Sequence, residues 1–330
     1  MASNLADITA LKPKDYKTDV HNDWCPGCGD FGILNGVHQA LAKLQLDPSK
    51  VMMYSGVGCS SKIPHYVKTY GVHTLHGRSL PFSTGSKLAN DELTVIVAGG
   101  DGDGLGIGAG HFVGTGRRNT NMTYLIHNNG VYGLTKGQAS PTLKLGMQTK
   151  SLKLPNPNEG LNPLAMAICS GYTFVARTYA YDAKHLSATI VAAIEHRGTS
   201  FVDVLQPCPT YNNLHTKDWY GEEIDVEGVK MPRTYYLSET DYDGVVKDST
   251  NQQDVERTKA KALERVTISE DRIPLGVFYQ VQQSTYMDRV RENVEPLRGT
   301  TSAKLPICDA QGNPVTDLTD LYKEFRTDIY

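Results

Sequence analysis

The chain has 330 residues, with 33 Lys+Arg against 36 Asp+Glu and a formal net charge of −3. This near balance, without a long basic run, makes nucleic acid an unexpected partner. The first residues show no basic stretch followed by an apolar core, and no run approaches the roughly 18 apolar residues of a membrane span. We therefore expect a cytoplasmic protein that does not enter a membrane.

Helical and strand-like patterns of apolar residues alternate along the first two thirds of the chain. Helical spacing links Ile33, Leu34, Val37, Leu41 and Leu44. The predicted elements that follow are a strand at Val51–Tyr54, a helix at Ser83–Asn90, a strand at Leu93–Ala98, a glycine-rich helix from about Leu105, a strand at Met122–Ile126, a long loop from Gly130 to Asn162, a helix at Leu164–Cys169, a strand at Thr173–Ala176, a helix at Ala183–His196 and a strand at Phe201–Leu205. This alternation predicts an α/β fold with right-handed crossovers and a doubly wound parallel sheet.

Beyond residue 218 this alternation stops. Residues 219–330 are mixed and charged, and they contain one predicted helix near Gln252–Val266. We therefore divide the chain into a ligand-binding domain, 1–218, and a C-terminal extension, 219–330, that contacts a partner subunit.

Polar residues follow two neighbouring strands at the points where these strands end. Asp101 lies in a Gly-Asp-Gly motif after Leu93–Ala98, and Asn129 follows Met122–Ile126. The carboxyl ends of parallel strands meet at one edge of the sheet, where ligands collect. Mg²⁺ prefers oxygen ligands and commonly takes one or two carboxylates together with phosphate, and the N–H groups at a helix N-terminus bind the same anion. The pattern predicts a divalent cation holding a diphosphate.

A dinucleotide-binding fold is the competing hypothesis. The segment from Gly104 to Ala109 matches the loose G-x-G-x-x-A pattern after a strand. That pattern expects an acidic residue about 20 positions further on, whereas the next strand ends in His127-Asn-Asn. The dinucleotide hypothesis is therefore disfavoured. The alternative that these glycines only form a tight strand-to-helix turn stays open.

Four of the six cysteines lie in loops with proline or glycine neighbours. Cys25 and Cys28 form a C-x-x-C motif, Cys59 follows a predicted strand, and Cys208 lies between two prolines. Because no export signal is present, metal ligands or free thiols are expected rather than disulfides. A thioredoxin-type pair would leave two of the four unexplained. Their spacing alone leaves structural zinc and an iron–sulfur cluster equally open.

The two remaining cysteines have no partner motif. Cys169 lies in an apolar helical stretch and is expected to be a small buried hydrophobe. Cys308 lies in the extension.

Several motifs occur together in one order. They are Trp24-Cys-Pro-Gly-Cys-Gly, Gly58-Cys-Ser-Ser-Lys-Ile-Pro, Leu75-His-Gly-Arg78, Gly100-Asp-Gly-Asp103, His127-Asn-Asn129, Tyr132-Gly-Leu-Thr-Lys-Gly-Gln138 and Leu205-Gln-Pro-Cys208. With these motifs, the chain from about Trp24 to Asn213 resembles the β subunit of a 2-oxoacid:ferredoxin oxidoreductase. The segment from Thr135 to Thr142 resembles the branch that acts on 2-oxoglutarate.

The resemblance implies thiamine diphosphate, Mg²⁺, one [4Fe–4S] cluster and coenzyme A as co-substrate. The implied Mg²⁺ ligands are Asp101, Asn129 and the carbonyl of Val131, and the implied cluster ligands are Cys25, Cys28, Cys59 and Cys208. The cofactor-binding residues expected on this basis are Cys59, Ser60, Ser61, His76, Gly100, Asp101, Gly102, Asp103, Asn129, Val131, Gly133, Leu134 and Thr135.

The activity implied is the oxidative decarboxylation of a 2-oxoacid to acyl-CoA and CO₂, or the reverse carboxylation, with electrons passed through the cluster to ferredoxin. The resemblance also implies an α subunit, in a dimer of heterodimers, that supplies a glutamate to the cofactor. A nonredox thiamine decarboxylase or synthase with structural zinc, and a noncatalytic electron-transfer subunit, are the alternatives.

Four basic residues in the motif loops are the candidate catalytic groups. They are Lys62, His76, Arg78 and Lys136. An arginine offers a two-pronged contact to a carboxylate and a lysine offers a point charge, while His76 can bond the diphosphate or transfer a proton. The substrate carboxylates, the diphosphate and the coenzyme A phosphates compete for these cations, and simple solvation of Lys136 is the alternative.

Overall fold

The strands that hold the predicted ligand residues lie at the centre of one mixed sheet. The computed structural model describes residues 10–268, 271–317 and 319–325. Within these ranges, eight strands form the sheet in the order β11-β12-β7-β8-β4-β3-β1-β2. Their bounds are β1 Val51–Ser55, β2 Tyr70–His73, β3 Thr94–Gly100, β4 Met122–Asn128, β7 Phe174–Tyr179, β8 Thr199–Leu205, β11 Thr234–Tyr236 and β12 Ile273–Gln280.

The central strands are parallel and buried on both faces. Every residue of β8 is buried, and β3 and β4 are buried except at their ends. Parallel pairing runs from β2 through β1, β3, β4 and β8 to β7. Continuous apolar runs such as Leu93–Ala98 are typical of such doubly covered strands. The predicted α/β fold is therefore confirmed.

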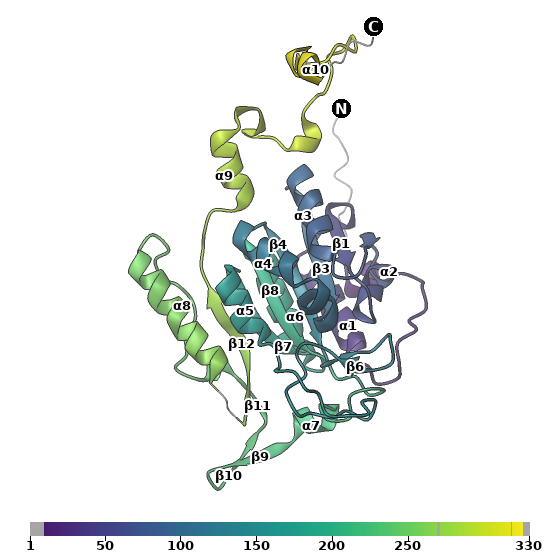
Figure 1. Cartoon of the computed structure of the whole chain (residues 1–330), viewed down its shortest axis with the longest axis vertical. Helices are drawn as coiled ribbons and strands as arrows, with labels where there is room; N and C mark the ends of the chain where they lie inside the picture. Colours follow the sequence, from purple (N-terminus) through teal and green to yellow (C-terminus); the bar gives the residue numbers. More distant parts are fainter. Residues whose placement is uncertain (1–9, 269–270, 318, 326–330) are drawn as a thin grey trace.

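Helices cover both faces of the sheet (Figure 1). One core joins the sheet to α1 and α6 through Ile33, Val37 and Leu186. The second core, on α3, α4 and α5, includes Leu80 and Phe112. The helix bounds are α1 Asp30–Lys43, α2 Ile63–Tyr66, α3 Ser79–Ala89, α4 Ala109–Arg118, α5 Pro163–Ser170, α6 Ala183–Glu195, α7 Lys217–Gly221, α8 Gln252–Thr267, α9 Tyr286–Asn293 and α10 Thr319–Phe325. No helix of the described ranges combines the length and apolarity that crossing a membrane requires.

Part of the C-terminal segment belongs to the central sheet. Strand β12 pairs antiparallel with β7, and β11 pairs parallel with β12 at the sheet edge, so the sheet is mixed rather than wholly parallel. Helix α8 lies between these two strands in the chain and packs against α5 and β12. A small hairpin, β9 Glu223–Val226 and β10 Val229–Pro232, precedes them.

Three further differences from the sequence-based prediction are local. The helix expected at Ser83–Asn90 begins at Ser79. The glycine-rich segment forms a π-helical turn, Gly102–Ile107, before α4 begins at Ala109. The predicted loop from Gly130 to Asn162 contains a short hairpin of β5 Val131–Tyr132 and β6 Gln138–Ala139.

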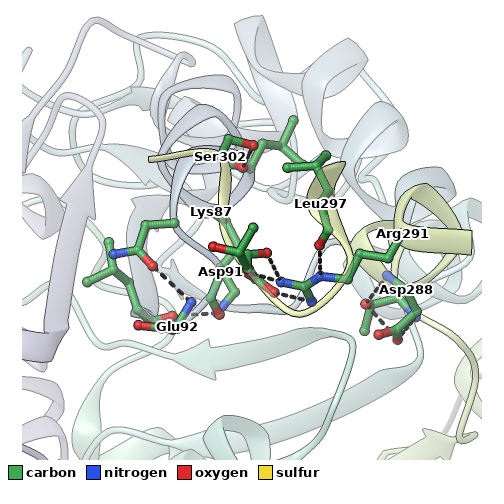
Figure 2. A network of polar contacts seen from close by, with 12 residues as sticks. Lys87, Asp91, Glu92, Asp288, Arg291, Leu297 and Ser302 are labelled. Atoms are coloured by element: carbon green, nitrogen blue, oxygen red, sulfur yellow. Dashed lines mark hydrogen bonds and ion pairs between the residues drawn. The ribbon is translucent and has the colours of Figure 1, made fainter. Parts of the chain in front are cut away.

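After β12 the chain crosses to the amino ends of the strands and is held there by ion pairs (Figure 2). The two terminal nitrogens of Arg291 meet the two carboxylate oxygens of Asp91 at 2.7 and 2.8 Å. Lys304 pairs with Glu92 at 2.5 Å. The planar two-pronged pair of Arg291 and Asp91 fixes the geometry of the contact as well as its charge. These contacts place α9 and residues 294–304 at the end of the sheet opposite α7 (Figure 1).

A buried lysine in the same network makes stability depend on pH. Lys87 is 4% exposed and donates to the carbonyls of Asp91 and Leu93. Burial lowers the pKa of Lys87 to about 8, against about 10.4 in an unfolded chain. As pH rises from 8 to 10.4 the folded protein releases a proton that the unfolded chain retains, so stability rises.

We expect the unfolding free energy of the natural protein to gain about 3 kcal/mol over that of Lys87→Met as pH rises through this window. Below pH 8 both states bind the proton and the difference is constant. Thermal unfolding at pH 7.5 and 10.5 measures the change, with Lys230→Met on the exposed β9–β10 hairpin as control. The expectation would be contradicted if the difference in unfolding free energy between Lys87→Met and the natural protein were the same at both pH values.

Candidate functional site

A cavity of about 270 Å³ lies at the carboxyl ends of the central strands. Its lining comes from the loops after β1, β2, β3 and β4. The lining residues are Val57, Gly58, Cys59, Ser60, His76, Gly100, Asp101, Gly102, Asp103, His127, Asn129, Val131, Tyr132, Gly133, Leu134 and Thr135. All of the expected cofactor-binding residues except Ser61 are among them. Ser61 is buried beside the cavity, and its carbonyl accepts from Ser55 at 2.7 Å.

Asp101 ties the Gly-Asp-Gly turn to the loop after β4. One carboxylate oxygen accepts from the N–H of Gly102 at 3.0 Å. The other accepts from the N–H of Gly130 at 2.9 Å and from the hydroxyls of Ser140 and Thr142, both at 2.5 Å. Burial raises the pKa of Asp101, while these hydrogen bonds act in the opposite direction. The carboxylate is thus fixed in direction, as a metal ligand requires.

Asn129 and Val131 complete the expected oxygen set. The Asn129 amide donates to Gln206 Oε1 at 2.7 Å and accepts from the N–H of Val131 at 3.0 Å. The Asn129 carbonyl accepts from Asn212 at 2.8 Å. These bonds hold the start of the β5–β6 hairpin against the segment after β8. A buried carboxylate, an amide and a backbone carbonyl on one cavity wall fit a Mg²⁺ ion.

Glycines give the cavity room for a bulky anion. Gly58 has a φ of +134°, and no atom lies within 4 Å of a Cβ added there. A Cβ on Gly102 would lie 2.3 Å from the ring of Tyr132, so this ring packs directly on the backbone of the turn. Only glycine permits both the unusual backbone angle and this close approach. The wall therefore fits a diphosphate.

Asp103 positions His76 at the cavity. One oxygen of Asp103 accepts from the N–H of Gly77 at 2.7 Å and the N–H of Val57 at 3.0 Å, and lies 2.8 Å from His76 Nδ1. The second oxygen is buried and has no hydrogen-bond partner among the described residues. This carboxylate joins the loops after β1 and β2 and sets the orientation of the imidazole.

Of the four basic candidates, His76 lines the cavity and the other three do not. Lys62 pairs with Asp23 at 2.7 Å. Arg78 donates to the carbonyls of Gly77 and Ile107 at 3.2 and 3.4 Å. Lys136 is exposed in the turn between β5 and β6, next to the lining residue Thr135.

The predicted cluster ligands surround one region beside the cavity. Cys28 and Cys208 are buried, Cys59 is partly buried and Cys25 is exposed, all as free thiols. A Cβ added to Gly133 would lie 3.5 Å from the sulfur of Cys59 and 3.9 Å from that of Cys208. Within the described ranges, no three side chains of the His, Cys, Asp and Glu types converge closely enough to hold a metal ion. The four thiols lie in one region, but their sulfur atoms are not close enough together to bind one metal ion.

The chemistry of these thiols nevertheless fits a bound cation. Burial, and then Asp30, raise the pKa of Cys28. Burial raises the pKa of Cys59 to about 11. Gln206 donates to the Cys28 sulfur at 3.2 Å. Buried thiolates are costly unless positive charge offsets their desolvation, which bound iron would supply.

A buried pair that the sequence-based prediction missed joins the two regions. His127 Nδ1 lies 2.6 Å from Asp30, and both side chains are 1% exposed. The other oxygen of Asp30 accepts from the Cys28 thiol at 3.4 Å. His127 lines the cavity, and its Nε2 has no partner among the described residues. The only sequence signal was the position of His127 before the two asparagines.

Cys169 corrects one expectation. It is exposed on α5 rather than buried. Helix α5 buries Leu164, Ala167 and Ile168, and Cys169 lies on the face turned away from them. Cys308 is also exposed.

Comparison with known proteins agrees with this geometry. The family model described as "Thiamine pyrophosphate enzyme, C-terminal TPP binding domain" matches residues 54–204. The model for the C-terminal part of the pyruvate ferredoxin oxidoreductase beta subunit matches residues 208–294. The chain is 52% identical over 309 residues to the 2-oxoacid:ferredoxin oxidoreductase subunit beta of Saccharolobus solfataricus, covering 92% of this chain and 97% of that protein.

Two further relatives carry 2-oxoglutarate in their names. The 2-oxoglutarate oxidoreductase subunit KorB of Mycobacterium tuberculosis is 42% identical over 202 residues, 61% of this chain and 54% of that protein. A solved 2-oxoglutarate:ferredoxin oxidoreductase from Magnetococcus marinus, with 2-oxoglutarate, coenzyme A and succinyl-CoA bound, superposes with a TM-score of 0.78 at 35% identity, covering 98% of each chain.

Proposed function

The chain belongs to the family of 2-oxoacid:ferredoxin oxidoreductase β subunits, and on that premise we propose that it oxidatively decarboxylates 2-oxoglutarate to succinyl-CoA and CO₂. In this proposal Cys25, Cys28, Cys59 and Cys208 would hold a [4Fe–4S] cluster, which would supply the route for electrons to ferredoxin. The steps are reversible, so the same site also supports carboxylation when the reduced carrier drives it.

One observation carries the proposal: Cys59 belongs to both parts of the site. It lines the cavity with Asp101 and Asn129, and its sulfur lies with that of Cys208 beside Gly133. Thiamine diphosphate would supply a nucleophilic carbon and an electron sink when the carboxylate leaves. Thiols that share a wall with its binding cavity would hold a cluster close enough to accept electrons from that reaction.

The residues of this chain have separate tasks in the proposed site. Asp101 and Asn129, with the carbonyl of Val131, hold Mg²⁺ and through it the diphosphate. His76 is a hydrogen-bond donor or proton carrier whose ring Asp103 orients. Tyr132, packed on Gly102, excludes water from the turn.

The turn between β5 and β6 supports 2-oxoglutarate as the substrate. Lys136 has a φ of +78°, which is uncommon outside glycine. Its N–H bonds to the carbonyl of Gly133 at 3.1 Å, and the N–H of Gly137 bonds to that of Tyr132 at 2.9 Å. This turn thus places Lys136 directly after Thr135, which lines the cavity, and we propose that its ammonium group pairs with the distal carboxylate of a dicarboxylic 2-oxoacid.

Lys136→Ala is therefore expected to reduce kcat/KM for 2-oxoglutarate more than for pyruvate. A charge-assisted contact is worth about 1.5–3 kcal/mol, which corresponds to roughly ten- to a hundredfold. Lys153→Ala, an exposed lysine of the same loop region, is the matched control. Equal losses on both substrates would contradict the role in substrate choice and place Lys136 at coenzyme A or the reacting atoms instead.

The proposed site is completed by an α subunit. Leu75, Ile107 and Leu134 are each more than half exposed, and Leu134 lines the cavity while Leu75 precedes His76. Apolar side chains grouped at a cavity are typical of a surface that a partner covers. We propose that this surface is covered by the α subunit, which also supplies the glutamate that activates the cofactor, in a dimer of heterodimers.

A panel of 2-oxoacids assayed for CoA-dependent dye reduction tests this function. The complete complex is expected to prefer 2-oxoglutarate, and this chain alone, loaded with iron and thiamine diphosphate, is expected to show no turnover. Full activity from the isolated chain would contradict the need for the α subunit. An assembled complex without turnover on any 2-oxoacid would contradict the activity.

A further inference from the structure

The two carboxylate oxygens of Asp101 are used differently. Oδ2 accepts hydrogen bonds from the N–H of Gly130 and from the hydroxyls of Ser140 and Thr142. Among the described residues, Oδ1 accepts only from the N–H of Gly102. Each oxygen of an ionised carboxylate has about two lone-pair sites. Oδ2 is therefore saturated, and Oδ1 is the oxygen with free acceptor capacity.

Thr142 has a second acceptor at the end of β4. Its hydroxyl lies 2.8 Å from Oδ1 of Asn128, the residue before the expected ligand Asn129. The side-chain nitrogen of Asn128 donates to Oδ1 of Asp203 at 2.9 Å. A carboxylate only accepts hydrogen bonds, so this contact fixes the amide orientation and turns the Asn128 oxygen toward Thr142. Thr142 is partly exposed, and without this acceptor its hydroxyl could turn to water.

A buried ion pair anchors the far end of this chain of contacts. Asp203 on β8 is fully buried, and its other oxygen accepts from Nε of Arg177 on β7 at 2.8 Å. The ring of Phe278 on β12 lies 5.9 Å from the Arg177 guanidinium. Neither member of the pair lines the cavity. A buried ion pair adds little net stability, because desolvation offsets its attraction. What this pair supplies is a fixed acceptor for the Asn128 amide.

We propose that Asn128 and Asp203 are positioning residues for the proposed Mg²⁺ site, with Thr142 as their link to Asp101. Asp203 orients the Asn128 amide, and Asn128 keeps the Thr142 hydroxyl on Oδ2 of the ligand. Oδ1 of Asp101 then stays directed at the metal. This inference rests on the proposed function, because the chain of contacts has this use only if Asp101 binds a metal. Replacing residues that hold a metal ligand in place typically weakens metal binding about 10- to 100-fold.

The test measures metal affinity directly, with Mn²⁺ as the probe because it takes the same oxygen ligands. The complete α/β complex that contains Asn128→Leu is freed of divalent cations and dialysed against Mn²⁺ with thiamine diphosphate. Leucine removes the donor and the acceptor of the amide but leaves Arg177 paired with Asp203. We expect the Kd for Mn²⁺ to rise about 10- to 100-fold, with iron content unchanged and kcat close to the natural value at saturating Mg²⁺. This split between affinity and kcat distinguishes positioning from catalysis.

Asn162→Leu is the matched control. The Asn162 side chain also makes two hydrogen bonds, from the N–H of Ala165 and to the carbonyl of Val266, and it does not line the cavity. This control should lose stability but keep the natural Kd for Mn²⁺.

Variants of Thr142 test the link itself. Thr142→Val should raise the Kd for Mn²⁺, and Thr142→Ser, which keeps the hydroxyl, should restore the affinity. Adding Asn128→Leu to Thr142→Val should cause little further change, because both substitutions act through one hydroxyl. Fully additive effects of the two substitutions would overturn the inference.

An unchanged Kd for Mn²⁺ in Asn128→Leu would overturn the positioning role while leaving the proposed function intact. A fall in kcat at saturating Mg²⁺ without a change in Kd would also overturn it, since Asn128 would then act on the reacting groups. If Asn128→Leu does not fold, Asp203→Asn decides the question, with a smaller rise in Kd expected and no rise counting against the role. A natural complex that binds Mn²⁺ but oxidises no 2-oxoacid is a different result and counts against the function itself.

Discussion

Replacing Asp101 with alanine is expected to abolish 2-oxoacid oxidation by the assembled enzyme while leaving its iron content unchanged. Asp101 is 1% exposed and accepts hydrogen bonds from two N–H groups and two hydroxyls. Its removal deletes a proposed Mg²⁺ ligand and leaves four buried donors without an acceptor. Each buried donor left unsatisfied costs about 1–3 kcal/mol of folding stability, and the lost metal ligand is expected to bring turnover to background.

Asp101→Asn separates the two causes. The amide keeps the shape of the side chain and can accept some of the four bonds, but it is a weaker ligand for Mg²⁺. Thiamine diphosphate retained after desalting, iron content and kcat/KM are the three measurements. Normal turnover with retained cofactor in Asp101→Ala would show that the metal assignment is wrong.

Cys208→Ser is expected to reduce iron content and to bring ferredoxin reduction down to background. Burial raises the pKa of Cys208, and the backbone N–H groups of Tyr211 and Asn212 act in the opposite direction. These N–H groups favour a thiolate at this position, and a serine hydroxyl is a harder and poorer ligand for iron. Iron analysis and ferredoxin reduction measure the two effects.

Cys169→Ser is the matched control for this experiment. Cys169 is exposed on α5 and lies outside the four-cysteine region. The control should keep both iron and ferredoxin reduction at the natural level. Full iron content in Cys208→Ser would remove that residue from the ligand set.

The central strands were predictable because burial on both faces leaves continuous apolar runs in the sequence. Leu93–Ala98 and Met122–Ile126 each became a buried strand with nearly the expected bounds. Strand β2 was missed because most of its four residues are exposed at the sheet edge, where no alternation arises. Strand β12 was also missed, because Pro274 and Gly276 interrupt the run of apolar residues that would indicate a strand. The proline is tolerated because it lies before the stretch, Gly276 to Gln280, that pairs with β7.

The ligand side chains at strand ends were predictable for a topological reason. Parallel strands bring their carboxyl ends to one edge, so Asp101 and Asn129 had to lie near each other once the sheet was known. The pair of Asp30 and His127 was not predictable, because 97 residues separate its members and the motif that contains His127 does not indicate Asp30 as its partner. Long basic side chains are a third case. The sequence motifs correctly place their loops at the site, but they do not determine where the ends of the side chains point. Lys62, for example, pairs with Asp23 instead of lining the cavity.

The measurement that tests the account most directly is anaerobic visible spectroscopy of the complete complex during titration with 2-oxoglutarate. The account predicts a brown protein whose absorbance bleaches when substrate and coenzyme A are added, and returns when oxidised ferredoxin is supplied. Iron and thiamine diphosphate should be present together in the same sample. The account would be contradicted by a colourless complex that contains zinc and decarboxylates the substrate. It would also be contradicted by a brown complex whose visible spectrum does not change when any 2-oxoacid is added.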